Sequence, residues 1–99
     1  MQTSYTLTES QLQKMSNNFK ALADESRIKI LLFLLDGEKS VNTISTRLSI
    51  GQSATSHHLR ILKDTGILKV KREGNINYYY ISDKHIETIM QTSLEHLGC

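Results

Sequence analysis

Apolar side chains recur at helical spacing along the first third of the chain and predict two helices. After an arm of residues 1–7, Thr8 or Ser10 can cap the first helix, and Asp24 can cap the second. Asp36 and Gly37 end the second helix. The apolar face of the first helix is predicted to consist of Leu12, Met15, Phe19 and Leu22. The residues of the second helix predicted to lie in the core are Ile28, Ile30, Leu31, Leu34 and Leu35.

Two shorter helices are predicted next, joined by the brief segment Ser49-Ile50-Gly51. Ser53 can cap the second of them, and Gly66 ends it. Short helices joined by a tight turn are typical of a helix-turn-helix. The apolar positions expected to face the core are Val41, Ile44 and Leu48 in one helix, and Leu59, Ile61 and Leu62 in the other.

A hairpin and a last helix complete the pattern. Residues 67–72 alternate apolar and basic side chains, and residues 76–81 are rich in β-branched and aromatic ones, so both segments predict strands. Glu73-Gly74-Asn75 between them indicates a turn. Apolar residues from Ile86 to Leu97 follow helical spacing and predict a helix over about residues 83–97. The whole order predicts one mainly α domain over residues 1–99, a winged helix-turn-helix whose wing is the β-hairpin.

Composition narrows the class of protein. A chain of 99 residues with 38% hydrophobic residues has a small core, so we expect a homodimer that covers further apolar surface. No segment approaches the ~20 apolar residues that span a bilayer, and residues 1–10 lack a signal peptide's apolar core. The single cysteine, Cys99, cannot form an intrachain disulfide. These features predict a cytoplasmic protein with no membrane partner.

Charge is unevenly distributed along the chain, although the formal net charge is only +2. Between residues 57 and 72, five cations accompany a single acid, Asp64. Such a band fits a face that meets phosphates, and a solvated surface is the alternative interpretation. The five cations are Arg60, Lys63, Lys69, Lys71 and Arg72.

Short polar side chains begin the second helix of the predicted motif, and this end enters the major groove in helix-turn-helix proteins. Cations further along this helix and polar side chains near the hairpin tip are better placed for DNA phosphates. A cap at Ser53 and a packed imidazole at His57 are the alternative interpretations. The predicted DNA-binding residues are Gln52, Ser53, Thr55, Ser56, His58, Arg60, Lys63, Lys71, Arg72 and Asn75.

Four metal-binding side chains lie in the last 17 residues: Asp83, His85, His96 and Cys99. His85 and His96 share a helix face but are about 16 Å apart along the axis. Metal–nitrogen bonds are about 2 Å long, so one helix cannot close both pairs on one ion. We therefore predict two symmetric sites in an antiparallel homodimer, where Asp83 and His85 of one chain meet His96 and Cys99 of the other. Asp83 acting only as a helix cap is the alternative.

The run from Phe19 to Ile81 resembles the ArsR/SmtB family of bacterial metal-responsive repressors. Residues 19–31 match its opening signature, residues 53–63 match its recognition helix, and residues 66–68 and 71–74 match the entry to its wing. The resemblance implies a homodimer built from the first and last helices. It also implies that this dimer binds a double-stranded operator with dyad symmetry and represses transcription.

The resemblance extends to the last helix. One group of the family has Asp-x-His early in this helix and His-x-x-His or His-x-x-Glu later, and this chain departs only by Cys99 at the fourth position. The implied effector is Zn(II), with Co(II), Cd(II) or Ni(II) as alternatives, and its binding would lower DNA affinity and derepress a metal efflux or resistance gene. In relatives the residue matching His96 links toward the recognition helix, which makes His57 and His96 candidate coupling residues.

Other functions remain open at this point. A metal-independent or thiol-responsive repressor of the same fold would sense through Cys99, and an architectural DNA-binding module would use a metal only for stability. An enzyme is not expected, because no nucleophile, base and orienting group occur together. Ser56 and His57 are neighbours on a helix and point about 100° apart.

Overall fold

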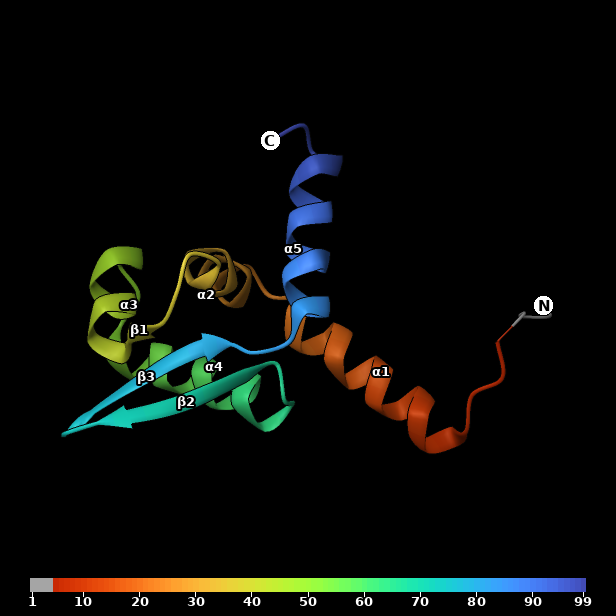
Figure 1. The fold of residues 1–99 in the computed structure, drawn as a ribbon, viewed down its shortest axis with the longest axis horizontal. Coiled ribbons are helices and arrows are strands. Elements are labelled where there is room, and N and C mark those ends of the chain that lie inside the picture. Colours follow the sequence, from red (N-terminus) through yellow and green to blue (C-terminus); the bar gives the residue numbers. More distant parts are fainter. Residues whose placement is uncertain (1–4) are drawn as a thin grey trace.

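The computed structural model describes residues 5–99 and has the mainly α order with a hairpin wing that the sequence predicts (Figure 1). The expected arm of residues 1–7 falls partly on residues 1–4, which lie outside the described residues. The elements are α1 (Glu9–Leu22), α2 (Glu25–Leu34), β1 (Lys39–Ser40), α3 (Val41–Leu48), α4 (Gln52–Asp64), β2 (Leu68–Glu73), β3 (Ile76–Ile81) and α5 (Lys84–His96).

The predicted core is present, with one exception. Side chains of α2, α3 and α4 are fully buried against one another, and Ile67 and Leu68 cover them from the base of the wing. Ile28 was expected in this core, but it is 37% exposed, because it lies on the side of α2 that faces α5 rather than α4. The buried helical side chains include Ile30, Leu31, Ile44, Leu59 and Leu62.

The helix-turn-helix is formed by α3, a short turn and α4. Ser40 caps α3 by accepting a hydrogen bond from the Thr43 N–H at 3.2 Å. Ser49 ends α3 in the left-handed conformation, with φ of 54°. The prediction that Ser53 caps α4 is wrong. Gly51 is the N-cap and offers no side-chain acceptor, so α4 begins two residues earlier than predicted and Ser53 lies inside its first turn.

The wing is an antiparallel hairpin extended by one short strand. β3 lies between β1 and β2, and the β2–β3 register pairs Leu68 with Ile81 and Glu73 with Ile76. Gly74 supplies the positive φ of 61° that the tight turn needs. β1 was not predicted, because two residues are too short to show a period-2 pattern. It exists through pairing with Tyr78 and Tyr79 of β3.

The first and last helices extend away from the body formed by α2, α3, α4 and the sheet (Figure 1). Thr8 begins α1 in a reciprocal capping box with Gln11. Only Ala21 and Leu22 of α1 are buried, and only Ile86 and Met90 of α5. Both helices therefore leave part of their apolar faces uncovered in one chain. Within residues 5–99, no helix has the length and hydropathy needed to cross a membrane.

Candidate nucleic-acid interface and metal-binding residues

The outward face of α4 carries a contiguous set of polar and basic side chains. Helical spacing places them together, and they line one shallow hollow on the exposed side of the helix. The set offers hydroxyl, amide, imidazole and guanidinium groups, which are the groups that read base edges and bind phosphates. We call it the α4 outer face, and it consists of Gln52, Ser53, Ser56, His57 and Arg60.

Three predicted DNA-binding residues of α4 do not belong to this set: Thr55, His58 and Lys63. Lys63 is exposed in the last turn of the helix, beyond the α4 outer face. Thr55 is fully buried, because it lies four residues before Leu59 and belongs to the same core stripe as Leu59 and Leu62. This spacing is visible in the sequence and could have excluded Thr55. The side chain of His58 is only 17% exposed and turns toward α2, so the exposed imidazole of this helix is that of His57.

The wing contributes charges of two kinds. Lys71 Nζ lies 3.1 Å from Glu38 and 3.0 Å from Glu73, and these two carboxylates raise the pKa of Lys71, with Glu73 the larger cause. Its charge is therefore compensated within the protein. Arg72 donates through Nε to the Gly74 carbonyl at 3.0 Å, which holds the guanidinium at the hairpin turn beside exposed Asn75. Arg72 is thus the better-placed wing cation for a phosphate.

A polar cleft between α3, the start of α4 and the wing adds two residues that the sequence argument missed. Asn42 and Asn77 line it together with Gln52 and Asn75. Amide side chains donate hydrogen bonds to phosphate oxygens without selecting a base. Asn42 and Asn77 are 35 positions apart in the sequence, so only the packing of the wing against α3 reveals that they share a cleft.

The four predicted metal ligands occupy the two ends of α5. Asp83 caps the helix: its Oδ1 accepts from the His85 N–H at 2.8 Å and lies 2.8 Å from His85 Nδ1. The His85 backbone bond, followed by its side-chain bond, lowers the pKa of Asp83. At the far end, Cys99 is exposed, and its N–H donates to the Leu94 carbonyl at 3.0 Å.

The structure brings Asp83 and His85 together but leaves His96 and Cys99 at the opposite end of α5. Within residues 5–99, no three His, Cys, Asp or Glu side chains of one chain are grouped closely enough to hold a metal ion. His85 is highly exposed, with 92% of its side chain accessible. His96 and Cys99 are exposed as well, whereas Asp83 is partly buried as the helix cap.

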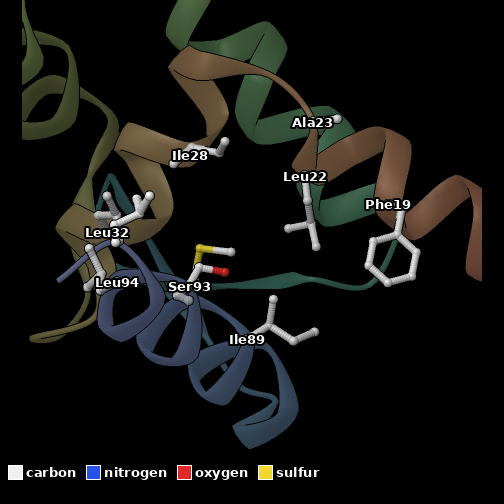
Figure 2. A pocket seen from close by; sticks show the side chains of 10 residues that line it. Phe19, Leu22, Ala23, Ile28, Leu32, Ile89, Ser93 and Leu94 are labelled. Carbon is white, nitrogen blue, oxygen red and sulfur yellow. The ribbon is translucent and has the colours of Figure 1, made fainter. Parts of the chain in front are cut away.

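An apolar groove of about 360 Å³ separates the end of α1 from α5 (Figure 2). Side chains of α1, α2 and α5 point into it from three sides. Phe19 remains 57% exposed at its edge, and Leu97 remains 74% exposed. The other lining residues are Leu22, Ala23, Ile28, Leu32, Ile89, Met90, Ser93 and Leu94.

Residues 24–70, which span α2, the helix-turn-helix and the first half of β2, match the family described as bacterial regulatory protein, arsR family. The transcriptional activator HlyU of Vibrio cholerae is 36% identical over 95 residues, covering 89% of this chain and 87% of that protein. The chain belongs to the ArsR family. Since this family consists of DNA-binding transcriptional regulators, the exclusion of an enzyme is confirmed.

Two further similarities place this ArsR-family chain among known proteins. The cadmium resistance transcriptional regulatory protein CadC homolog of Staphylococcus aureus is 38% identical over 79 residues, which are 79% of this chain but only 65% of that protein. The chain thus spans less than two thirds of that relative's length. A homodimeric winged helix-turn-helix DNA-binding domain from Mycobacterium bovis superposes with a TM-score of 0.86 at 26% identity, covering 99% of this chain and 91% of that one. The predicted fold class is confirmed.

Proposed function

We propose that this chain is a homodimeric transcriptional repressor that binds double-stranded operator DNA in the cytoplasm. The observation that carries the proposal is the α4 outer face, which presents base-reading and phosphate-binding groups on an exposed recognition helix. Arg72 and the amide-lined cleft beside it extend the same surface toward the wing. A winged helix-turn-helix uses such a surface to place α4 in the major groove and the wing over the flanking backbone.

Dimerisation is supported by the apolar groove between α1 and α5. Leu12, Met15, Phe19 and Leu97 are large apolar side chains that one chain leaves more than a third exposed. A second copy of the chain would remove them from water, and the Mycobacterium bovis domain is homodimeric by its description. A two-fold dimer presents two copies of α4, so its operator should contain two half-sites related by dyad symmetry, about one helical turn of DNA apart.

Regulation by a divalent metal is the second part of the proposal. Asp83 and His85 of one protomer with His96 and Cys99 of its partner would hold the ion, and their oxygen, nitrogen and thiolate donors fit Zn(II) best, with Co(II), Cd(II) and Ni(II) as alternatives. A bound ion would cross-link the two α5 helices. The structure supports this through the preformed Asp83–His85 pair and the backbone bond that holds Cys99 in a turn. The expected output is release of the operator and derepression of a metal efflux or resistance gene.

Selection from a pool of random 40-bp duplexes tests DNA binding. The wild-type chain should enrich an inverted repeat, and Ser56→Ala should weaken binding to that repeat by roughly tenfold, since it removes a group from the reading face. Lys29→Gln removes an exposed charge on α2 and is the matched control.

Transcription in vitro from a promoter carrying the repeat tests repression, and it should fall as protein is added. No enriched sequence would contradict DNA-specific function, and increased transcription would make the protein an activator.

Native mass spectrometry of the dimer with added Zn(II) tests the metal part. Two ions per dimer are expected for wild type, and His96→Ala should lose both, because one ligand of each site disappears. Co(II) loading should give a sulfur-to-metal charge-transfer band that Cys99→Ser abolishes.

Regulation is tested by comparing operator affinity with and without Zn(II). Equal affinity in wild type and His96→Ala under both conditions would contradict metal regulation, and an effect seen only on oxidising Cys99 would favour a thiol sensor.

A further inference from the structure

A partly buried polar junction connects α1, α2 and α4. Arg27, in the first turn of α2, donates through Nε to the Ala21 carbonyl at 2.7 Å and through Nη2 to the Lys20 carbonyl at 3.4 Å. Both acceptors belong to the last turn of α1. The Nη1 group of Arg27 lies 3.3 Å from Nδ1 of His58 on α4. One guanidinium therefore touches the end of α1 and the recognition helix at once.

The chemistry of the junction determines the role of His58 in it. A guanidinium can only donate, so Nδ1 of His58 is the acceptor in the Arg27 contact. Asp24 Oδ2 accepts the Arg27 backbone N–H at 3.0 Å and lies 3.9 Å from the same imidazole nitrogen. The carboxylate thus caps the start of α2 through the Arg27 backbone and lies near the His58 imidazole.

The junction matters because α1 is anchored to its own chain at one end only. Its buried residues are Ala21 and Leu22, both in the last turn, and the rest of the helix projects from the body (Figure 1). Because α1 is buried against its own chain only at its last turn, the contacts at that turn set the direction of the helix. The Arg27 bonds to the Lys20 and Ala21 carbonyls in the last turn of α1 are directional and charge-assisted, whereas apolar packing of two side chains is not directional.

We infer that Arg27 and His58 are positioning residues that set the direction of α1 relative to α4. The inference rests on the proposed function in one respect: α1 supplies part of the dimer surface and α4 reads DNA. The angle between them then fixes the separation of the two recognition helices. Removing either partner leaves both helices folded but lets α1 pivot about its buried end. Half-sites at several separations would then be tolerated.

Spin labels on α1 and α4 of one chain measure the angle without DNA. The labels are placed at Lys14→Cys and Ser53→Cys in a Cys99→Ser background, and the labelled chain is diluted with unlabelled chain. Wild type should give one narrow distance distribution. Arg27→Gln and His58→Leu should broaden it, with unchanged helix content by circular dichroism. Equally narrow distributions in both variants would overturn the inference.

Two matched variants separate the junction from general destabilisation. His58→Asn keeps an acceptor near the position of Nδ1 and should restore the narrow distribution. Lys29→Gln removes an exposed cation of α2 that takes no part in the junction, and it should also leave the distribution narrow. Broadening by Lys29→Gln to the extent seen in Arg27→Gln, or failure of His58→Asn to restore the distribution, would overturn the inference.

The selected inverted repeat provides the functional readout. Inserting one base pair between its half-sites should weaken wild-type binding strongly. In Arg27→Gln and His58→Leu this penalty should fall roughly tenfold, the scale of one charge-assisted hydrogen bond, while base preference within each half-site stays the same. An unchanged penalty would overturn the inference. If wild type selects no repeat, the proposed DNA function fails, and the distance distributions still decide the junction.

Discussion

Thr55 is buried at the centre of the recognition helix, and among the described residues its hydroxyl has no hydrogen-bond partner. A buried polar group without a partner typically costs about 1–3 kcal/mol, and valine has nearly the same shape as threonine without this group. The residue that resembles a base-reading threonine in the sequence is thus a slightly unfavourable core residue.

Thr55→Val should raise the free energy of unfolding by about 1 kcal/mol, because it removes the unsatisfied hydroxyl and keeps the packed volume. Urea unfolding measures this change. Thr55→Ser is the matched control: it keeps the hydroxyl, deletes a methyl group and should lower stability by about 1 kcal/mol. Operator affinity should be unchanged in Thr55→Val. A loss as large as that of Ser56→Ala would mean that residue 55 contacts DNA.

Asp24 makes the start of α2 sensitive to pH. Its pKa lies below the ordinary value of 3.8, chiefly because the Arg27 backbone N–H bonds the carboxylate. A depressed folded-state pKa means that the stabilisation is present above the unfolded-state pKa and is lost as pH falls through the folded-state value. Asp24 therefore stabilises the fold at neutral pH and ceases to do so in acid.

Asp24→Asn keeps a side-chain oxygen for the cap but removes the titrating charge. Wild type should be the more stable protein at pH 7, and the difference should shrink as the pH falls below about 4. Urea unfolding of both proteins between pH 3 and 7 measures it. A difference that is constant over this range would show that the Asp24 charge contributes nothing to stability.

At the scale of elements, the wing is held in place by Lys71, which the sequence predicts to bind DNA. Lys71 connects β2 to Glu38, in the segment between α2 and β1, and to Glu73 at the strand end. It therefore positions the hairpin against the body of the molecule, while Arg72 remains available at the turn. The two adjacent lysine and arginine residues of one strand thus have different roles.

Arg72→Gln should reduce the slope of log affinity against log salt by about 1, as expected for the loss of one phosphate contact. Lys71→Gln should reduce it much less, because its charge is already compensated by Glu38 and Glu73. Fluorescence anisotropy with the selected repeat at about 50–300 mM salt measures the slope for both variants. Equal changes in slope would show that both cations contact phosphate.

At the scale of the whole molecule, the uncovered apolar faces of α1 and α5 decide whether the chain works alone. Leu12, Met15 and Phe19 follow one another along α1 and remain exposed in the monomer. Residues at the centre of such a surface contribute most of the association energy. The dimer should therefore depend on them rather than on the polar side of α1.

Phe19→Glu should weaken dimerisation by at least roughly tenfold, because a charge would be buried in the apolar groove. Analytical ultracentrifugation measures the shift toward monomer. Gln13→Glu introduces the same charge at an α1 residue whose amide bonds Asn17, and it should leave the dimer intact. A stable Phe19→Glu dimer would place the interface elsewhere.

The sequence by itself determined every element except the short strand β1, and most of the α4 outer face. Helix caps at Thr8, Asp24 and Asp83 join residues within three positions of each other, and apolar periodicity repeats every few residues, so both are visible locally. Paired donors at the two ends of α5 were visible for the same reason. The similarity to solved winged helix-turn-helix structures confirmed the fold class, while the metal ligands stay a prediction.

Only the tertiary structure decided which polar residues work inside the protein and which face outward. Arg27 meets His58 across 31 positions, and Lys71 meets Glu38 across 33. Such contacts depend on how helices and strands pack, and residue spacing carries no information about packing. For the same reason the exposed imidazole proved to be His57, and Thr55 proved to be core. Local patterns specify elements, whereas the roles of their charged and polar side chains follow from the neighbours that folding supplies.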